Sequence, residues 1–411
     1  MTTLLPLPVE DLAAAFADED CGPAHAVRER LRAAPPLVAR AETELLSVRL
    51  AAVARGEAFL LQGGDSTRPA AGDPQVHLEA NLRVLHQTGV ALMYATGLPV
   101  VKTAQVCGPY ARPHGLADDG IARDHALSAP IMNLFRGLCR GESPSLDRIH
   151  RWNTEFVRTA AGARHRVLAD RIGRGLRFME AGGFTDHTAR TAEVYTSRRM
   201  VAPDDERAMM RPDTEADRPA GRDTSTPRPM GQDAAPAGPA TSMVSGSAHF
   251  LWLDARTARA DASYTDLVRR VSNPVGLRIG PDTTAAHVAD LVERLDPRAD
   301  PGRLTLTCAM GGGRVRDLLP SIVERVEATG RQVVWQCDPV HRNPGEFEGA
   351  LDEVAGFIEV HRRLGTHPGG LRVETAGSRE SAGSCESAAG ARLTGSHAVE
   401  LGFHTAELLG T

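Results

Sequence analysis

The stretch 304-LTLTCAMGGGRVRDLLPSIVERVEATGRQVVWQC-337 holds two short apolar runs with a helical pattern between them. The runs at 304–308 and 333–337 are too apolar to have a wet face, and the apolar residues between them recur at spacings of three and four. Strands buried on both faces are typical of parallel sheets, in which a helix crosses from one strand to the next. The stretch therefore predicts a strand–helix–strand unit whose helix ends at Gly330.

The same alternation extends over most of the chain. Strand and helix repeated about eight times are what a closed parallel barrel requires. We therefore predict an α/β fold, a (β/α)8 TIM barrel over 41–411, with a helical N-terminal extension over 1–40. The other predicted strands lie at 59–62, 99–104, 194–196, 249–253, 275–279 and 371–374, and further helical patterns lie at 284–295, where Thr283 or Thr284 is a plausible N-cap, and at 350–365.

One segment, at about 201–245, interrupts the alternation. It is rich in Pro, Asp, Gly, Ala and Thr and has no apolar periodicity. Such a sequence cannot bury enough apolar surface to offset the entropy of ordering it, so we expect a mobile insertion. We interpret Asp204 and Asp205 within it as a solvated acidic pair, with a metal contact as the alternative.

The composition excludes several classes of function. The net charge of −5 provides no broad basic field for nucleic acid, and no apolar run is long enough to cross a membrane. The acidic N-terminus does not have the pattern of a secretory signal, so we expect a cytoplasmic protein. The six cysteines form no CxxC pair, which argues against a zinc module or a disulfide framework.

The loops that follow the strand ends carry the chemistry in a parallel barrel. Several are glycine-rich, such as 309-AMGGGR-314, which would let backbone amides approach an anion. Arg256 and Arg278 are suited to bidentate contacts with phosphate or carboxylate, with ordinary solvated salt bridges as the alternative. His341 and Glu374 follow the last two strands and could share a divalent ion. The alternative is that His341 caps a turn and Glu374 pairs with an arginine.

A family resemblance rests on many motifs in the right order. They include 56-GEAFLLQGGD-65, 152-WNTEFVRT-159, 247-SAHFLW-252, 280-GPDTT-284 and 335-WQCDPVH-341. With these motifs the chain resembles the class II DAHP synthases, which condense phosphoenolpyruvate with erythrose 4-phosphate on a metal-dependent (β/α)8 barrel. The resemblance covers most of the chain. It implies small phosphorylated anionic substrates, a divalent metal such as Mn²⁺ or Mg²⁺, no nucleotide cofactor, and a homo-oligomer, which we expect to be a dimer.

The metal site that this resemblance implies is substituted at two positions. His341 and Glu374 match the family's histidine and glutamate ligands, but the cysteine position is Ser66 and the aspartate position falls at Gly390. A neutral hydroxyl is a poor ligand for Mn²⁺. We therefore expect a weakened metal site formed by His341, Glu374 and Ser66.

The phosphoenolpyruvate pocket implied by the resemblance is substituted as well. Two arginines of the family are replaced by Gln105 and Ala309, a glutamate by Ala255, and a strand lysine by Arg278. Two lost arginines would weaken anion binding by about 10² to 10⁴. The expected catalytic residues are Arg256, Arg278 and Gln105, and the expected substrate-binding residues are Arg256, Arg278, Trp252 and Ala309.

Three functions are compatible with these substitutions. The first is an enzyme of specialised metabolism with a roomier, less charged pocket and an anion-binding corner at Arg256 and Arg278. In it, Cys308, Ala309 and Met310 would line a strand end where the family has a guanidinium. Such an enzyme would catalyse elimination, transfer or cyclisation of a phosphate or diphosphate compound with an apolar body. The second is a genuine DAHP synthase with compensating ligands. The third is a catalytically inactive homologue that regulates a partner.

Overall fold

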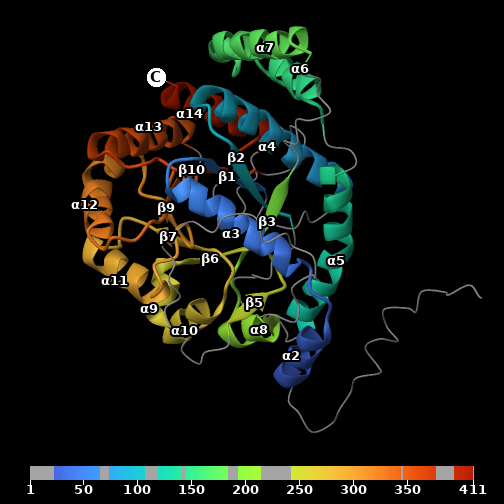
Figure 1. The fold of residues 1–411 in the computed structure, drawn as a ribbon, viewed down its shortest axis with the longest axis vertical. Coiled ribbons are helices and arrows are strands. Elements are labelled where there is room, and N and C mark those ends of the chain that lie inside the picture. The colour runs from blue at the N-terminus through green and yellow to red at the C-terminus, as the bar shows by residue number, and fades with distance from the viewer. Residues whose placement is uncertain are drawn as a thin grey trace, which may run out of the picture.

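A closed barrel of parallel strands forms the centre of the protein (Figure 1). The computed structural model describes residues 23–64, 74–106, 119–140, 144–183, 193–213, 242–343, 346–375 and 393–410. The strand order in the barrel is β1-β10-β9-β8-β7-β6-β3-β2, which confirms the predicted (β/α)8 fold. The barrel strands are β1 Phe59–Gly64, β2 Val100–Gln105, β3 Val194–Arg199, β6 Phe250–Asp254, β7 Val275–Ile279, β8 Leu304–Cys308, β9 Val334–Cys337 and β10 Gly370–Arg372.

Helices connect successive barrel strands and cover the outside of the barrel (Figure 1). None of the helices in the described ranges is long and apolar enough to span a membrane. The helices are α2 Pro23–Ala33, α3 Arg40–Ala54, α4 Pro74–Thr96, α5 Asp119–Arg140, α6 Leu146–Phe156, α7 Arg166–Ala181, α8 Pro203–Ala208, α9 Ala255–Ala260, α10 Ala262–Arg270, α11 Ala285–Leu295, α12 Val315–Glu327, α13 Phe347–Leu364 and α14 Gly395–Leu409, with 3-10 turns η1 Ala163–His165 and η4 Gly312–Arg314.

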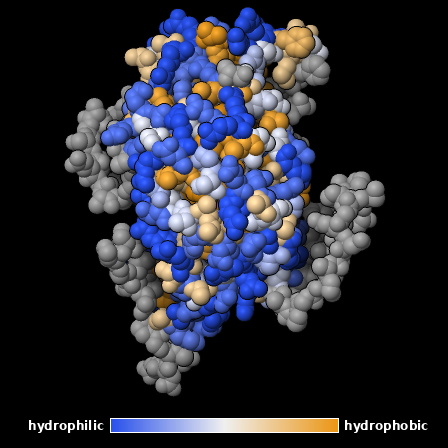
Figure 2. All heavy atoms as spheres, turned by 90° about the vertical axis from the view of Figure 1, so that its left-hand side faces the viewer, coloured by the Kyte–Doolittle hydropathy of each residue, from blue (hydrophilic) through white to orange (hydrophobic). Residues whose placement is uncertain are grey.

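Helix α11 shows why these segments fold as the sequence predicts. The hydroxyl of Thr284 accepts a hydrogen bond from the backbone N–H of His287 at 3.3 Å, which caps the helix and confirms one of the two predicted caps. Val288, Leu291 and Leu295, at spacings of three and four, are buried against the barrel. Figure 2 shows the opposite, solvent-facing side of α11, α12 and α13 as mostly hydrophilic, with small scattered apolar groups.

Helix α3 closes one end of the barrel. Gly302, in the loop before β8, lies against the backbone of Leu50, so α3 covers the amino-terminal ends of the strands. Because α3 covers the amino-terminal ends, the carboxyl ends of the strands form the open end of the barrel, where barrel enzymes place their chemistry. The interior cluster contains Leu46, Leu50, Val53, Ala58, Leu60, Val101, Tyr195, Phe250, Trp252 and Val334.

The flanks of the expected insertion form regular structure, in contrast to the predicted irregular segment. Residues 203–208 form α8, and β4 Met210–Pro212 pairs antiparallel with β5 Met243–Ser245. The buried guanidinium of Arg198 forms an ion pair with the buried carboxylate of Glu206, which attaches α8 to β3. Residues 214–241 lie outside the described part of the chain.

The acidic pair within this segment faces the N-terminal extension. Asp204 and Asp205 lie 3.4 and 3.3 Å from nitrogens of Arg28 on α2, and Asp204 also accepts a 2.7 Å hydrogen bond from Arg207. Asp204 is exposed, as predicted for a solvated pair, whereas the Asp205 side chain is only 15% exposed because it packs against Arg28. Apolar residues of α2 and α8, among them Leu31 and Ala208, pack in one small buried cluster. Residues 1–22 of the extension lie outside the described chain.

Candidate functional site

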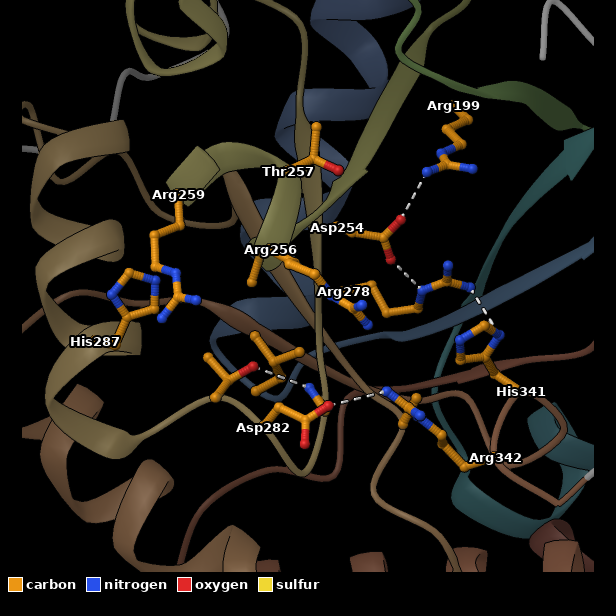
Figure 3. Close-up of a pocket in the computed structure, with 15 residues that line it drawn as sticks. Arg199, Asp254, Arg256, Thr257, Arg259, Arg278, Asp282, His287, His341 and Arg342 are labelled. Atoms are coloured by element: carbon orange, nitrogen blue, oxygen red, sulfur yellow. Dashed lines mark hydrogen bonds and ion pairs between the residues drawn. The ribbon is translucent and has the colours of Figure 1, made fainter. Parts of the chain in front are cut away.

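A cavity of about 620 Å³ opens at the carboxyl ends of the strands (Figure 3). Asp254 is the last residue of β6, Arg278 lies near the end of β7, Ala309 directly follows β8, and His341 lies in the loop after β9. The predicted site residues Arg256, Arg278, Ala309 and His341 all line this cavity. The structure therefore brings together residues that are as far as 85 positions apart in the sequence (341 − 256).

The cavity wall is strongly cationic. Only alanines and one isoleucine contribute apolar side chains to it, and the expectation of a pocket less charged than that of the family stays a prediction. Arg256 and Arg278, at which the sequence predicts an anion-binding corner, are two of five arginines that line the cavity. The charged and titratable wall residues are the arginines Arg199, Arg256, Arg259, Arg278 and Arg342, the histidines His287 and His341, and the aspartates Asp254 and Asp282.

Arg278 is oriented by partners on several sides. Its Nε donates to Oδ1 of Asp254 at 2.7 Å, and its Nη1 lies 3.1 Å from Nδ1 of His341 (Figure 3). The same Nη1 lies 3.8 Å from Oδ2 of Asp338. Arg199 binds the other oxygen of Asp254 at 2.9 Å. Because only 12% of the Arg278 side chain is exposed, its ion pair with Asp254 is mostly buried and not a solvated salt bridge, whereas Arg199 lies at the exposed edge of the network.

The network also sets the protonation states at the site. Burial and the neighbouring Arg278 lower the pKa of His341 below its ordinary value, so the imidazole is neutral near pH 7. Since Nδ1 accepts from a guanidinium, the proton of the neutral ring is on Nε2. Burial disfavours the ionised form of Asp254, but its ion pairs with Arg278 and Arg199 hold the pKa of that carboxyl below the ordinary value.

Two further arginines of the wall are available to a ligand. Arg256 and Arg259 are exposed and have no carboxylate partner within the described ranges. Arg342 lies 3.7 Å from the exposed Asp282, a distance at which the attraction is weak. Figure 3 shows Arg259 beside His287 and apart from Arg278, so cationic groups approach the cavity from separate sides.

Trp252 lies beneath the network and does not line the cavity. The guanidinium carbons of Arg372, Arg278 and Arg199 lie 4.1, 5.1 and 5.7 Å from the centre of its ring. An indole face attracts such cations and restricts their planes. Trp252 thus contacts arginines that surround the site, and its predicted contact with the substrate stays a prediction.

Three other expected wall residues lie elsewhere. Gln105 is buried at the end of β2, where it pairs with Gly64 of β1, and it does not line the cavity. Its predicted catalytic role stays a prediction. Cys308 and Met310 lie at the end of β8, as expected, but they are fully buried and do not line the cavity beside Ala309. Residues on either side of Ala309 along the chain point into the protein because the backbone alternates at the strand end.

The residues expected to bind a metal are engaged with arginines. Glu374 accepts a hydrogen bond from Arg372, as the alternative for this residue predicted, and His341 faces Arg278. Ser66 and Gly390 lie outside the described residues. Within the described ranges, no group of three or more His, Cys, Asp or Glu side chains could hold a metal ion. These residues by themselves therefore do not fit the divalent ion that the resemblance implies.

The sequence interpretation did not include Arg199 or Arg372. Arg199 ends β3, and the rule that strand ends carry the chemistry would have identified it. Arg372 is two residues before Glu374, and residues two apart in a strand point to the same side. If the side chain of Glu374 faces the site, the side chain of Arg372 is therefore expected to face it as well.

Comparison with known proteins agrees with this architecture. Residues 11–124 and 117–405 match the model of the class-II DAHP synthetase family. The chain is 40% identical, over 94% of its length and 90% of the relative, to the phospho-2-dehydro-3-deoxyheptonate aldolase AroG of Mycolicibacterium smegmatis. It is 34% identical, over 89% and 86%, to the phospho-2-dehydro-3-deoxyheptonate aldolase of Streptomyces coelicolor. The chain is therefore an enzyme that belongs to the class-II DAHP synthetase family.

Proposed function

We propose that the protein condenses phosphoenolpyruvate with a phosphorylated aldose, as a DAHP synthase does with erythrose 4-phosphate. The observation that carries this proposal is the cationic cavity, to which five arginines and two histidines contribute against two aspartates. Phosphoenolpyruvate bears a phosphate and a carboxylate, and the aldose bears a second phosphate. Three anionic groups require several cationic partners in one cavity. The names of the two relatives support the same reaction.

The residues of the cavity suit distinct roles in such a reaction. Arg278, fixed by Asp254 and His341, offers an oriented cation to a carboxylate or phosphate. Arg256 and Arg259 face the cavity without a carboxylate partner among the described residues and suit a second anionic group. His341 is neutral and protonated on Nε2, so it suits hydrogen-bond donation to a substrate oxygen as negative charge develops there.

A second candidate is an enzyme of specialised metabolism that acts on another phosphate or diphosphate compound. It is favoured by Gln105, Ala255 and Ala309, which stand where the resemblance places charged residues. The apolar body proposed for its substrate finds little support, because the wall is mostly polar. An inactive regulator is disfavoured, because both curated relatives are named as enzymes.

The deciding experiment measures phosphoenolpyruvate consumption by the purified, folded protein with erythrose 4-phosphate, both with Mn²⁺ and with EDTA. Turnover that is lost in Arg278→Lys and in Arg256→Ala supports the DAHP synthase reaction at this cavity. If phosphoenolpyruvate is not consumed under either condition, the first proposal is wrong. Release of phosphate or diphosphate from another ester, with the same dependence on Arg256, would then support the second candidate.

The cytoplasmic location and the dimer stay predictions. A dimer is proposed from the resemblance alone. Light scattering on the eluted peak of a size-exclusion column gives the mass of the particle in solution. A mass near twice that of the 43.9 kDa chain is expected. A mass equal to that of one chain would contradict the dimer.

A further inference from the structure

We propose that the guanidinium groups of Arg372 and Arg278 replace the divalent cation at His341 and Glu374, so that the cavity binds its anionic ligand without a metal. The proposal rests on the anion-binding role of the cavity in the proposed function. It concerns His341 and Glu374, the residues to which the resemblance assigns a metal. Arg372 does not line the cavity, so its role is to position Glu374.

Arg372 is a buried cation with carboxylate partners. It is 2% exposed, and it extends from β10 to Glu374, to which its Nη2 donates, and to Asp338, whose Oδ2 lies 3.7 Å from its Nε. A buried guanidinium is tolerated only when such partners compensate its loss of hydration. The ring of Trp252, 4.1 Å from the guanidinium carbon, holds the group in place.

Arg278 engages His341, the other residue to which the resemblance assigns a metal. Its Nη1 faces Nδ1 of His341 at 3.1 Å, so this lone pair of the imidazole is directed at a guanidinium. Oδ2 of Asp338 lies between the two arginines, 3.7 Å from Arg372 and 3.8 Å from Arg278. A divalent ion bound to His341 and Glu374 would lie next to both guanidinium groups, whose positive charges oppose it.

The charges of this cluster balance without an ion. Three arginines contact three carboxylates, so the paired charges of the cluster cancel. Adding a divalent cation would leave an excess of two positive charges in a mostly buried cluster, at a large cost in solvation. Together with the fixed geometry, this balance indicates that the arginines are part of the site and not accidental neighbours. The pairs are Arg199–Asp254, Arg278–Asp254, Arg278–Asp338, Arg372–Asp338 and Arg372–Glu374.

The test is Mn²⁺ binding to the full-length, EDTA-treated protein, followed by the electron paramagnetic resonance signal of free Mn²⁺. Wild type and the double variant His341→Ala/Glu374→Gln should give the same isotherm. Arg372→Gln, which releases Glu374 and removes one positive charge, should bind Mn²⁺ at least tenfold more tightly than wild type. Arg372→Lys keeps the charge and should gain no affinity. Arg298→Gln removes an exposed arginine that pairs with Asp300, and serves as the matched control.

Two results would overturn the proposal. One is saturable binding of a single Mn²⁺ to wild type that the double variant loses. The other is a folded Arg372→Gln protein, with the circular dichroism spectrum of wild type, that gains no Mn²⁺ affinity. If Arg372→Gln does not fold, the comparison of wild type with the double variant decides alone, and identical isotherms support the proposal.

The same measurements separate this inference from the proposed function. The Mn²⁺ isotherm requires no substrate, so it judges the inference even if phosphoenolpyruvate is not consumed. Turnover that EDTA leaves unchanged supports both proposals. Turnover that requires Mn²⁺ would overturn the inference and keep the function.

Discussion

The carboxylate of Glu353 accepts a 2.6 Å hydrogen bond from the backbone N–H of Met310. Its other oxygen accepts a 2.7 Å bond from Nδ2 of Asn343. Met310 follows β8 and Asn343 follows β9, so this buried residue of α13 joins the two loops that carry Ala309 and His341. Glu353 thereby links the outer helical layer to one side of the cavity.

Replacing Glu353 with glutamine should change how stability depends on pH. Burial raises the pKa of Glu353 from 4.5 to about 7, although backbone N–H groups of Gly311 and Met310 oppose the rise. The folded state thus holds the proton more tightly than the unfolded chain. Protonated Glu353 therefore contributes roughly 3 kcal/mol to the free energy of unfolding. This contribution is complete below about pH 4.5 and is lost by about pH 7.

Urea unfolding of both proteins across this pH range is the measurement. The free energy of unfolding of wild type, relative to Glu353→Gln, should fall as the pH rises from about 4.5 to about 7. Other titrating groups are common to the two proteins and cancel in the difference. A difference that does not vary with pH would show that Glu353 is not perturbed.

Replacing Arg256 with alanine should weaken phosphoenolpyruvate binding without a loss of stability. The side chain is exposed and lines the cavity, and no carboxylate within the described ranges pairs with it. Loss of one charge-assisted contact, worth about 1.5–3 kcal/mol, corresponds to roughly 10- to 150-fold in Kd. Isothermal titration calorimetry measures this change, and thermal unfolding should give the Tm of wild type. An unchanged Kd would remove Arg256 from the site.

Replacing Arg278 with alanine should weaken binding and also lower the Tm. Unlike Arg256, it is mostly buried and compensates Asp254 and Asp338. Removing one member of a buried ion pair leaves an uncompensated charge and costs about 3–5 kcal/mol. The destabilisation adds to the binding defect because the buried partners of Arg278 lose their counter-charge. A Tm equal to that of wild type would contradict the buried network.

Replacing Glu206 with alanine should destabilise the protein by about 3–5 kcal/mol, because it leaves the buried guanidinium of Arg198 without its carboxylate. Asp204 in the same helix is the matched control, since it is 54% exposed and its ion pairs are at the surface. Asp204→Ala should cost less than about 1 kcal/mol. Equal effects in urea unfolding would indicate that α8 is not held to the barrel by this pair.

Replacing Gly302 with alanine should destabilise the contact between α3 and the barrel. Gly302 has φ +70°, and a Cβ there would lie 2.3 Å from the carbonyl carbon of Leu50. Because that atom belongs to the backbone of α3, it cannot move aside as a flexible side chain could. Gly330 has φ +71° but open space around its Cβ, so Gly330→Ala measures the backbone cost alone, about 1 kcal/mol. Gly302→Ala should cost clearly more in urea unfolding. Similar values would mean that the α3 contact yields without cost.

The fold was predictable because its determinants are local. All eight apolar runs overlap barrel strands, and 275–279 and 304–308 coincide with β7 and β8. Buried parallel strands leave a continuous apolar signal, and amphipathic helices leave a spacing of three and four. The flanks at 203–213 were missed for a non-local reason. Helix α8 is held by a buried ion pair with Arg198 and by a small apolar cluster shared with α2, and neither leaves an apolar periodicity in the segment itself.

The barrel, its family and the strand ends that carry Arg256, Arg278 and His341 follow from the amino-acid sequence. The partners of these side chains follow from the folded barrel, in which Asp254 orients Arg278 and Arg372 engages Glu374. The physical reason is that burial and pairing depend on distances between side chains from different strands. Spacing along one chain predicts which side of a strand a residue faces, but the charge around it is set by neighbours that the closed barrel brings together.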